Sequence, residues 1–276
     1  MTAPLLRYSH DGWTFDVRDA GPPGAPVAIA LHGFPQTAAS WSGVVPHLVA
    51  AGRRVLAPDQ RGYSPGARPR EVSAYRVDRL AGDVLALADA ARADRFDLLG
   101  HDWGGAVAWY LAARHPDRVA TLVVASTPHP RALLAALPHG QAARSWYMGL
   151  FQLPWLPERL LGARGGALTR RLLADLPPAE RDRAVALLAD PAAARAALGW
   201  YRALLRPGPS SAGRVRVPTT YVWSDRDVAL GRYAAEATAR WVDADYRFAV
   251  LEGVSHWIPD ERPAELARLA LERMTG

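Results

Sequence analysis

The 276-residue sequence predicts an α/β protein, with a mostly parallel β-sheet flanked by helices and a helical segment inserted late in the sheet. Three observations lead to this prediction. Short apolar runs typical of buried strands alternate with amphipathic helical patterns along most of the chain. This alternation stops after Pro128 and resumes only near Val215. Half of the residues are hydrophobic, which is enough for one large core.

The alternating part of the chain supplies eight strands. Residues 5–8 and 13–19, joined by Asp11-Gly12, predict an opening β-hairpin. Strand-like runs follow at residues 27–31, 55–57, 95–99, 120–125, 219–223 and 246–251. Helical patterns lie between them at residues 38–51, 77–91, 106–114, 231–241 and 264–273.

The interruption predicts a separate helical unit after the sixth strand. Residues 130–213 are rich in Ala, Leu and Arg, contain several prolines and have no convincing strand pattern, so we expect four or five short helices. Residues 206–213 have the composition of a return loop. We therefore predict a core of residues 1–129 and 214–276 and a cap of residues 130–213. Such a cap would lie over the crevice at the carboxyl ends of the strands, where open α/β sheets bind ligands.

Composition narrows the possible partners. The chain has no cysteine, which excludes disulfides and thiolate metal sites. Neither a signal-peptide pattern nor an apolar stretch of membrane-spanning length occurs, so we expect a cytoplasmic protein without a membrane partner. The net charge is +6, but all 33 basic residues are arginines scattered among acids. This pattern argues against nucleic-acid binding.

The most informative motif is Gly100-His101-Asp102-Trp103-Gly104-Gly105, which places an aspartate between a strand-like run and a helical pattern. A GxSxG turn presents a nucleophilic serine at this point. An aspartate that attacks a saturated carbon leaves an ester whose carbonyl is the enzyme's own, and water can cleave that ester. Asp102 therefore indicates opening of C–O or C–halogen bonds at saturated carbon. The alternative is an ordinary helix N-cap.

A nucleophile needs a base, and the base needs a group that orients it. His256 follows the last strand-like run, in a loop that a rigid scaffold could hold. The end of the preceding strand offers two acids, Asp225 and Asp227, of which we prefer Asp227. Asp225 also suits a turn.

Hydrolysis of an Asp102 ester would build negative charge on a carboxyl oxygen of Asp102, so N–H donors must converge there. The candidates are the backbone N–H groups of Trp103 and of Phe34, in the segment His32-Gly33-Phe34-Pro35. His32 is assigned to holding this loop.

Taken together, these motifs resemble the α/β-hydrolase superfamily over essentially the whole chain, and specifically its epoxide hydrolases. The matching segments are HGFPQ at 32–36, DQRGYS at 59–64, GHDWGG at 100–105 and GVSHW at 253–257, with the acid at 227. The order nucleophile, acid, histidine is that of α/β-hydrolases. The resemblance implies the α/β-hydrolase fold and the addition of water to an epoxide, giving a vicinal diol through a covalent Asp102 ester. It implies no cofactor and no metal.

The resemblance also implies two cap tyrosines that hydrogen-bond the epoxide oxygen. Tyr147 in WYMGLFQ and Tyr201 in LGWYR stand in matching contexts. Two phenols could share the charge of the departing oxygen and supply a proton. For either tyrosine alone, a role as a core aromatic is the alternative.

Two rival functions remain open at this point. Haloalkane or haloacid dehalogenases use the same nucleophile and triad, although Phe34 stands where they usually carry a polar residue. A catalytically idle protein that binds a small ligand is the second alternative. An apolar epoxide is the expected substrate, with water as the second reactant, because further aromatic residues are predicted to line the pocket: Trp146, Phe151, Trp200 and Trp257.

Overall fold

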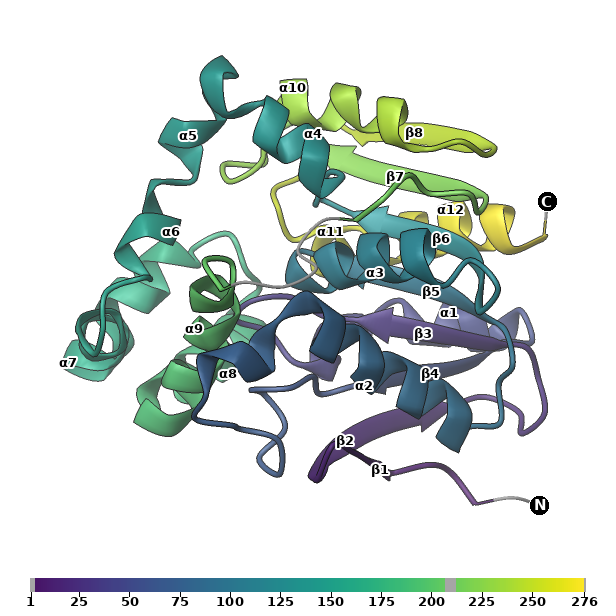
Figure 1. The fold of residues 1–276 in the computed structure, drawn as a ribbon, viewed down its shortest axis with the longest axis horizontal. Coiled ribbons are helices and arrows are strands. Elements are labelled where there is room, and N and C mark those ends of the chain that lie inside the picture. The colour runs from purple at the N-terminus through teal and green to yellow at the C-terminus, as the bar shows by residue number, and fades with distance from the viewer. Residues whose placement is uncertain (1–2, 207–211, 276) are drawn as a thin grey trace.

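The computed structural model describes residues 3–206 and 212–275 (Figure 1). Most of the predicted return loop, residues 207–211, lies outside the described residues. Within the described part of the chain, no helix is long and apolar enough to cross a lipid bilayer.

The predicted eight-stranded, mostly parallel sheet is confirmed, with the strand order β1-β2-β4-β3-β5-β6-β7-β8. Strand β1 pairs antiparallel with β2, and β2 pairs antiparallel with β4. Strands β3 to β8 all run parallel to one another. Strands β3, β5 and β7 are buried along their whole length, as expected for a sheet covered on both faces. The strand bounds are β1 Arg7–His10, β2 Trp13–Ala20, β3 Val27–Leu31, β4 Arg54–Pro58, β5 Phe96–His101, β6 Val119–Ala125, β7 Thr219–Ser224 and β8 Tyr246–Leu251.

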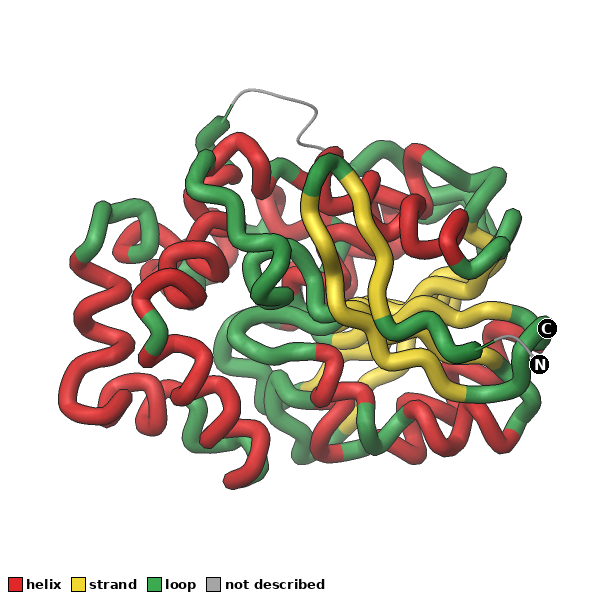
Figure 2. The backbone as a smooth tube through the Cα atoms, turned by 90° about the horizontal axis from the view of Figure 1, so that it is seen from below, coloured by secondary structure: helices red, strands yellow, loops and turns green. Residues whose placement is uncertain are grey.

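Helices cover both faces of the sheet (Figure 2). Helices α2 (Val77–Ala90) and α3 (Trp103–Arg114) pack on one face, and α1 (Val45–Ala50) and α12 (Pro263–Thr275) pack on the other. The helix α10 (Arg232–Ala237) continues as the 3-10 helix η4 (Thr238–Trp241), and α11 (Ile258–Glu261) precedes α12.

One predicted helix is divided. Residues 38–51 form the 3-10 helix η1 (Ala38–Trp41) and then α1, instead of one continuous helix. Pro46, in the first turn of α1, explains the break because proline lacks an N–H and clashes with the carbonyl four residues earlier.

Residues 130–206 of the insertion between β6 and β7 form helices joined by short loops (Figure 1), but they contain more helices than the four or five expected. The strand arrowheads of β3 and β7 point toward these helices in Figure 1, so the insertion lies at the carboxyl edge of the sheet. Helices α7, α8 and α9 pack together, whereas α4 packs on α10 and η4. The elements are α4 Pro130–Ala135, η3 Leu137–His139, α5 Gln141–Arg144, α6 Trp146–Leu150, α7 Leu156–Leu172, α8 Pro178–Ala189 and α9 Pro191–Ala203.

The inserted helices are attached to the core at specific points. The Trp200 indole N–H donates to the Arg61 carbonyl at 2.8 Å. Nearby, α9 packs on the 3-10 helix η2 (Val72–Tyr75), and Gly199 permits this contact because a Cβ there would lie 2.6 Å from the Tyr75 ring. These contacts fix α9, and with it Tyr201, relative to the sheet.

Candidate active site

Asp102 occupies a strained turn between β5 and α3. Its backbone has φ 50° and ψ −121°, a conformation that costs a non-glycine residue about 1–3 kcal/mol. The surrounding glycines make the turn possible. A Cβ on Gly33 would lie 2.3 Å from Oδ1 of Asp102, and one on Gly104 would lie 2.2 Å from the Leu31 carbonyl oxygen. The chain thus holds the Asp102 carboxylate against backbone that tolerates no larger residue.

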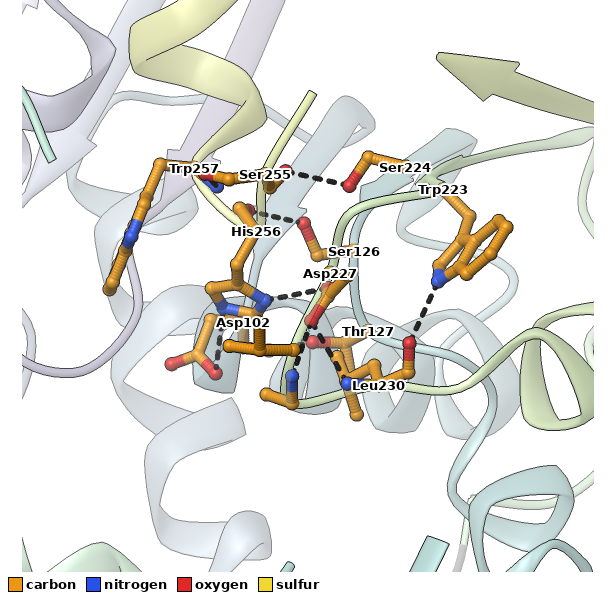
Figure 3. Close-up of polar contacts among 12 residues, drawn as sticks. Asp102, Ser126, Thr127, Trp223, Ser224, Asp227, Leu230, Ser255, His256 and Trp257 are labelled. Carbon is orange, nitrogen blue, oxygen red and sulfur yellow. Dashed lines mark hydrogen bonds and ion pairs between the residues drawn. The ribbon is translucent and has the colours of Figure 1, made fainter. Parts of the chain in front are cut away.

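Three predicted residues meet at this turn (Figure 3). Nε2 of His256 lies 3.5 Å from Oδ2 of Asp102, and Nδ1 of His256 lies 2.8 Å from Oδ2 of Asp227. The Asp227 side chain is fully buried, and its other oxygen accepts the backbone N–H groups of Ala229 and Leu230 at 2.8 and 2.9 Å. The imidazole therefore bridges two carboxylates, one of them fixed by its own loop.

The second acid considered from the sequence lies elsewhere. Asp225 accepts the backbone N–H of Gly253 at 2.7 Å and is exposed. This contact joins two loops that are 28 residues apart in the sequence, so it differs from the local turn that was the alternative interpretation of Asp225. Asp227, and not Asp225, faces His256.

The charges of this group reinforce one another. Burial opposes ionisation of Asp102, but hydrogen bonding and charge from His256 outweigh burial and lower the pKa of the Asp102 carboxyl. Burial likewise disfavours the imidazolium, yet the carboxylates of Asp227 and Asp102 raise the pKa of His256 to about 10. In the unliganded site near neutral pH, a carboxylate therefore faces an imidazolium.

The loop that carries His256 is held by residues that the sequence analysis did not identify. The His256 carbonyl accepts Oγ–H of Ser126 at 2.7 Å and lies 2.9 Å from Nε2 of His101, and Oγ–H of Ser224 donates to the Ser255 carbonyl at 2.7 Å. Burial lowers the pKa of His101 to about 4, so its ring is neutral and can donate from Nε2. All three donors stand at strand ends, which is the only signal that could have marked them.

Donors for a developing oxyanion are already directed at Asp102. The Phe34 N–H donates to Oδ1 of Asp102 at 2.6 Å. Burial raises the pKa of this carboxyl, whereas His256, His101 and then the hydrogen bond from the Trp103 N–H lower it. His32 holds the loop as expected. Its Nε2 accepts the Gln60 N–H at 3.1 Å, so Nδ1 carries the proton that is donated to the Gly33 carbonyl at 3.1 Å.

A cavity of about 150 Å³ opens onto Asp102, and both predicted tyrosines line it. The ring centroids of Tyr147 and Tyr201 are 6.1 Å apart. Burial raises the pKa of each phenol, and the Asp102 carboxylate raises it further. Both side chains are therefore neutral donors that face the same space as the carboxylate. The other walls are mainly apolar, including Val77, Leu133, Met148 and Leu204.

The four further aromatic residues do not line this cavity. The prediction for Trp146 is wrong, because its side chain is 64% exposed and does not line the cavity, whereas its neighbour Tyr147 on α6 does. Phe151 packs behind Tyr147 and Tyr201, and Trp200 contacts Trp103 from a smaller neighbouring pocket. Trp257 packs edge-on against His256, with ring centroids 5.0 Å apart. These three buried rings support the site from behind.

Among the residues that the structure describes, no group of three or more His, Cys, Asp or Glu side chains is arranged to hold a metal ion. The chemistry available from the described side chains is a buried carboxylate, a histidine with its acid, two backbone N–H donors and two phenols.

Comparison with known proteins shows the family to which this chain is similar. A family model for the alpha/beta hydrolase fold matches residues 26–263. Epoxide hydrolase A of Mycobacterium tuberculosis is 33% identical, with 100% of this chain and 99% of that protein covered. An AB hydrolase superfamily protein of Bacillus subtilis, YfhM, is 35% identical, with coverage of 95% and 94%. A solved structure described among epoxide hydrolases from metagenomes of hot environments matches with a TM-score of 0.86 at 32% identity, covering 100% of both chains.

Proposed function

We propose that this protein adds water to an epoxide and releases a vicinal diol, because the chain belongs to the α/β-hydrolase family and within it to the epoxide hydrolases. The observation that carries the proposal is the Asp102 carboxylate at the base of a cavity that two neutral phenols also line. A carboxylate facing two proton donors across an apolar space is suited to opening a strained C–O bond.

In the first step, Oδ2 of Asp102 attacks a ring carbon, because Oδ1 is held by the Phe34 N–H. The C–O bond breaks, its electron pair goes to the epoxide oxygen, and Tyr147 or Tyr201 donates a proton to that oxygen. The alkylated carboxyl carries no charge. Loss of this negative charge beside His256 lowers the pKa of the imidazolium, which returns its proton through water to the phenolate.

In the second step, neutral His256 takes a proton from water through Nε2, and the hydroxide attacks Cγ of Asp102. Negative charge develops on Oδ1, where the N–H groups of Phe34 and Trp103 stabilise it. Cleavage of the Cγ–Oδ2 bond releases the diol, and the proton on His256 goes to its departing oxygen. The regenerated Asp102 carboxylic acid then protonates His256, which restores the ion pair. Asp227 orients the imidazole and balances its charge throughout.

Two features disfavour a dehalogenase. The residue after His32-Gly33 is Phe34, which offers no side-chain donor to a halide. The Trp103 side chain packs against Tyr201, with ring centroids 5.0 Å apart. It also donates a hydrogen bond to the Tyr201 side chain. Burial raises the pKa of this phenol, and the hydrogen bond from Trp103 lowers it. Its indole is therefore already directed at the tyrosine.

A single turnover in water labelled with heavy oxygen tests the covalent step. We expect the label in the peptide that contains Asp102 and none in the first diol released, because the oxygen that leaves with the product comes from the carboxylate. Label in the diol and none in the peptide would mean direct attack by water. Parallel assays for diol and for released halide, on matched epoxides and haloalkanes, separate the two reaction classes, and absence of turnover on every substrate would favour a ligand-binding protein.

We further propose that residues 130–213 act as one cap over a core of residues 1–129 and 214–276, and that the enzyme works in the cytoplasm. The position of α5 to α9 at the carboxyl edge of the sheet supports the first statement. The absence of cysteine from the sequence is consistent with the second.

A further inference from the structure

Exposed hydrophobic side chains gather in the inserted helices. Of the thirteen large hydrophobic residues that the described structure leaves exposed, ten lie between residues 134 and 205. Five of the thirteen lie in or next to the segments that line the cavity over Asp102. Leu204 lines the cavity, Leu134, Trp146 and Val228 each adjoin a lining residue in sequence, and Leu205 follows Leu204. We call these five residues the rim; each is between 48% and 74% exposed.

The positive charge of the protein gathers in the same segment. Residues 130–206 contain eleven arginines and five acidic residues, a surplus of six that equals the net charge of the whole chain. The rest of the sequence is balanced. The arginines are therefore less evenly dispersed than the sequence analysis assumed, although no single block of them stands out.

Three of these arginines adjoin the rim without an acidic partner. Arg131 and Arg144 directly neighbour lining residues, and Arg206 follows Leu205. None of the three takes part in an ion pair among the described residues. Within the described part of the chain, Arg144 donates to the neutral carbonyls of Asp227 and Val228 and to no carboxylate, so its charge is not cancelled there.

Other charges near the mouth do not change this balance. The lining residue Val77 is flanked by Arg76 and Asp78, which form an ion pair with each other at 2.8 Å. Among the described residues that line the cavity, Asp102 is the only acidic one, and it lies at the base beside His256. The segments that line the cavity thus carry, in or next to them, exposed apolar residues and arginines that have no acidic partner among the described residues.

We propose that the rim and its three arginines dock the mouth of the cavity onto an anionic lipid bilayer. Exposed Trp and Leu side chains combined with arginine are the composition that binds the surface of anionic membranes. A second copy of this chain is a poorer occupant, because two segments that each carry a surplus of six positive charges repel one another. The docking requires no spanning helix, but it departs from the expectation from the sequence that the protein has no membrane partner.

Docking at this place would give the site a direct source of substrate. An apolar epoxide partitions into a bilayer, and a mouth held against the lipid would receive it without passage through water. The supply of substrate from the bilayer rests on the proposed function, whereas the docking itself needs no catalysis. Binding can therefore be measured separately from turnover.

The test compares the full chain with two matched double variants on vesicles. The vesicles consist of phosphatidylcholine alone, or of equal parts phosphatidylcholine and phosphatidylglycerol, and cosedimentation gives the bound fraction. The rim variant is Leu205→Asp with Arg206→Gln. The control variant is Leu172→Asp with Arg171→Gln, on α7, where both side chains are also exposed. The two variants change the same residue types and the same net charge.

We expect the native chain to bind the anionic vesicles and added salt to weaken this binding. Binding to phosphatidylcholine alone should be slight. The rim variant should partition at least about ten-fold more weakly, while the control changes by about two-fold. No binding of the native chain to anionic vesicles, or an equal loss in the two variants, would overturn the proposal. A native dimer that only the rim variant disrupts would assign the surface to a second copy instead. Diol formation from a water-soluble epoxide should be the same in all three proteins, and its absence would count against the proposed function alone.

Discussion

The charge of His256 should depend on the Asp102 carboxylate, and Asp102→Asn removes that charge with little change of shape. In the native site the carboxylates of Asp227 and Asp102, at 2.8 and 3.5 Å, outweigh burial and raise the pKa of His256 to about 10. A unit charge at 3.5 Å contributes about 4–5 kcal/mol at an effective dielectric constant of about 20, which corresponds to about 3 in pKa. We therefore expect a pKa of about 7 for His256 in the variant.

The titration can be followed by nitrogen NMR of the imidazole. Asp225→Asn is the control. It removes a charge from the loop that carries Asp227, but the Asp225 carboxylate contacts Gly253 and not His256. The native ring should stay doubly protonated to about pH 10, as in the control. A variant that keeps a pKa of about 10, or a native ring that is neutral at pH 7, would refute the reasoning.

The same value predicts how stability varies with pH. The folded pKa of His256 lies above that of an unfolded histidine, so the stabilising charge pair is fully present below about pH 6.5 and is lost as the pH rises to about 10. Asp102→Asn should flatten this dependence, because the variant loses one partner of the pair. Denaturant unfolding measured from pH 6 to pH 10 checks both statements, and equal slopes for the two proteins would contradict them.

Three other changes have definite expected outcomes. Asp227→Asn should slow hydrolysis of the ester by about 10²–10⁴-fold and slow its formation less. Alkylated protein should then accumulate and be detected by mass spectrometry. Absence of this adduct would count against the assigned order of steps. Tyr147→Phe and Tyr201→Phe should each slow alkylation, measured in a single turnover, and the double change should nearly abolish it, because both phenols face the leaving oxygen. Gly33→Ala should abolish activity because its Cβ would lie 2.3 Å from the nucleophile, while Gly149→Ala, with nothing within 4 Å, should leave activity intact; equal effects would remove the steric argument.

Much of the fold follows from local patterns. The six parallel strands were predictable because they appear as short apolar runs between turn residues, and the antiparallel hairpin of β1 and β2 was predictable from its turn at Asp11-Gly12. Boundaries shifted by a few residues, and residues 38–51 were divided where Pro46 interrupts the backbone hydrogen bonds. The cap was recognisable as helical, but its helices were harder to count, because segments of four to six residues contain too little periodicity.

The neighbours Trp146 and Tyr147 show the limit of sequence patterns within the site. Successive residues on a helix point about 100° apart, so only one of the two can face the cavity. The five-residue helix α6 does not define its buried face by its own pattern. Packing against Phe151 and Tyr201 turns Tyr147 inward and leaves Trp146 exposed.

The sequence by itself determined the α/β architecture, the elbow at Asp102 and the order in which Asp227 and His256 follow it, because these features depend on residue type and local spacing. Only the tertiary structure decided which acid reaches His256 and which strand ends hold its loop. It also decided where the arginine surplus of the inserted helices meets exposed apolar side chains. Contacts such as that of Ser126 with the His256 carbonyl join residues 130 positions apart, and their formation depends on how the parallel strands bring their ends to one edge of the sheet.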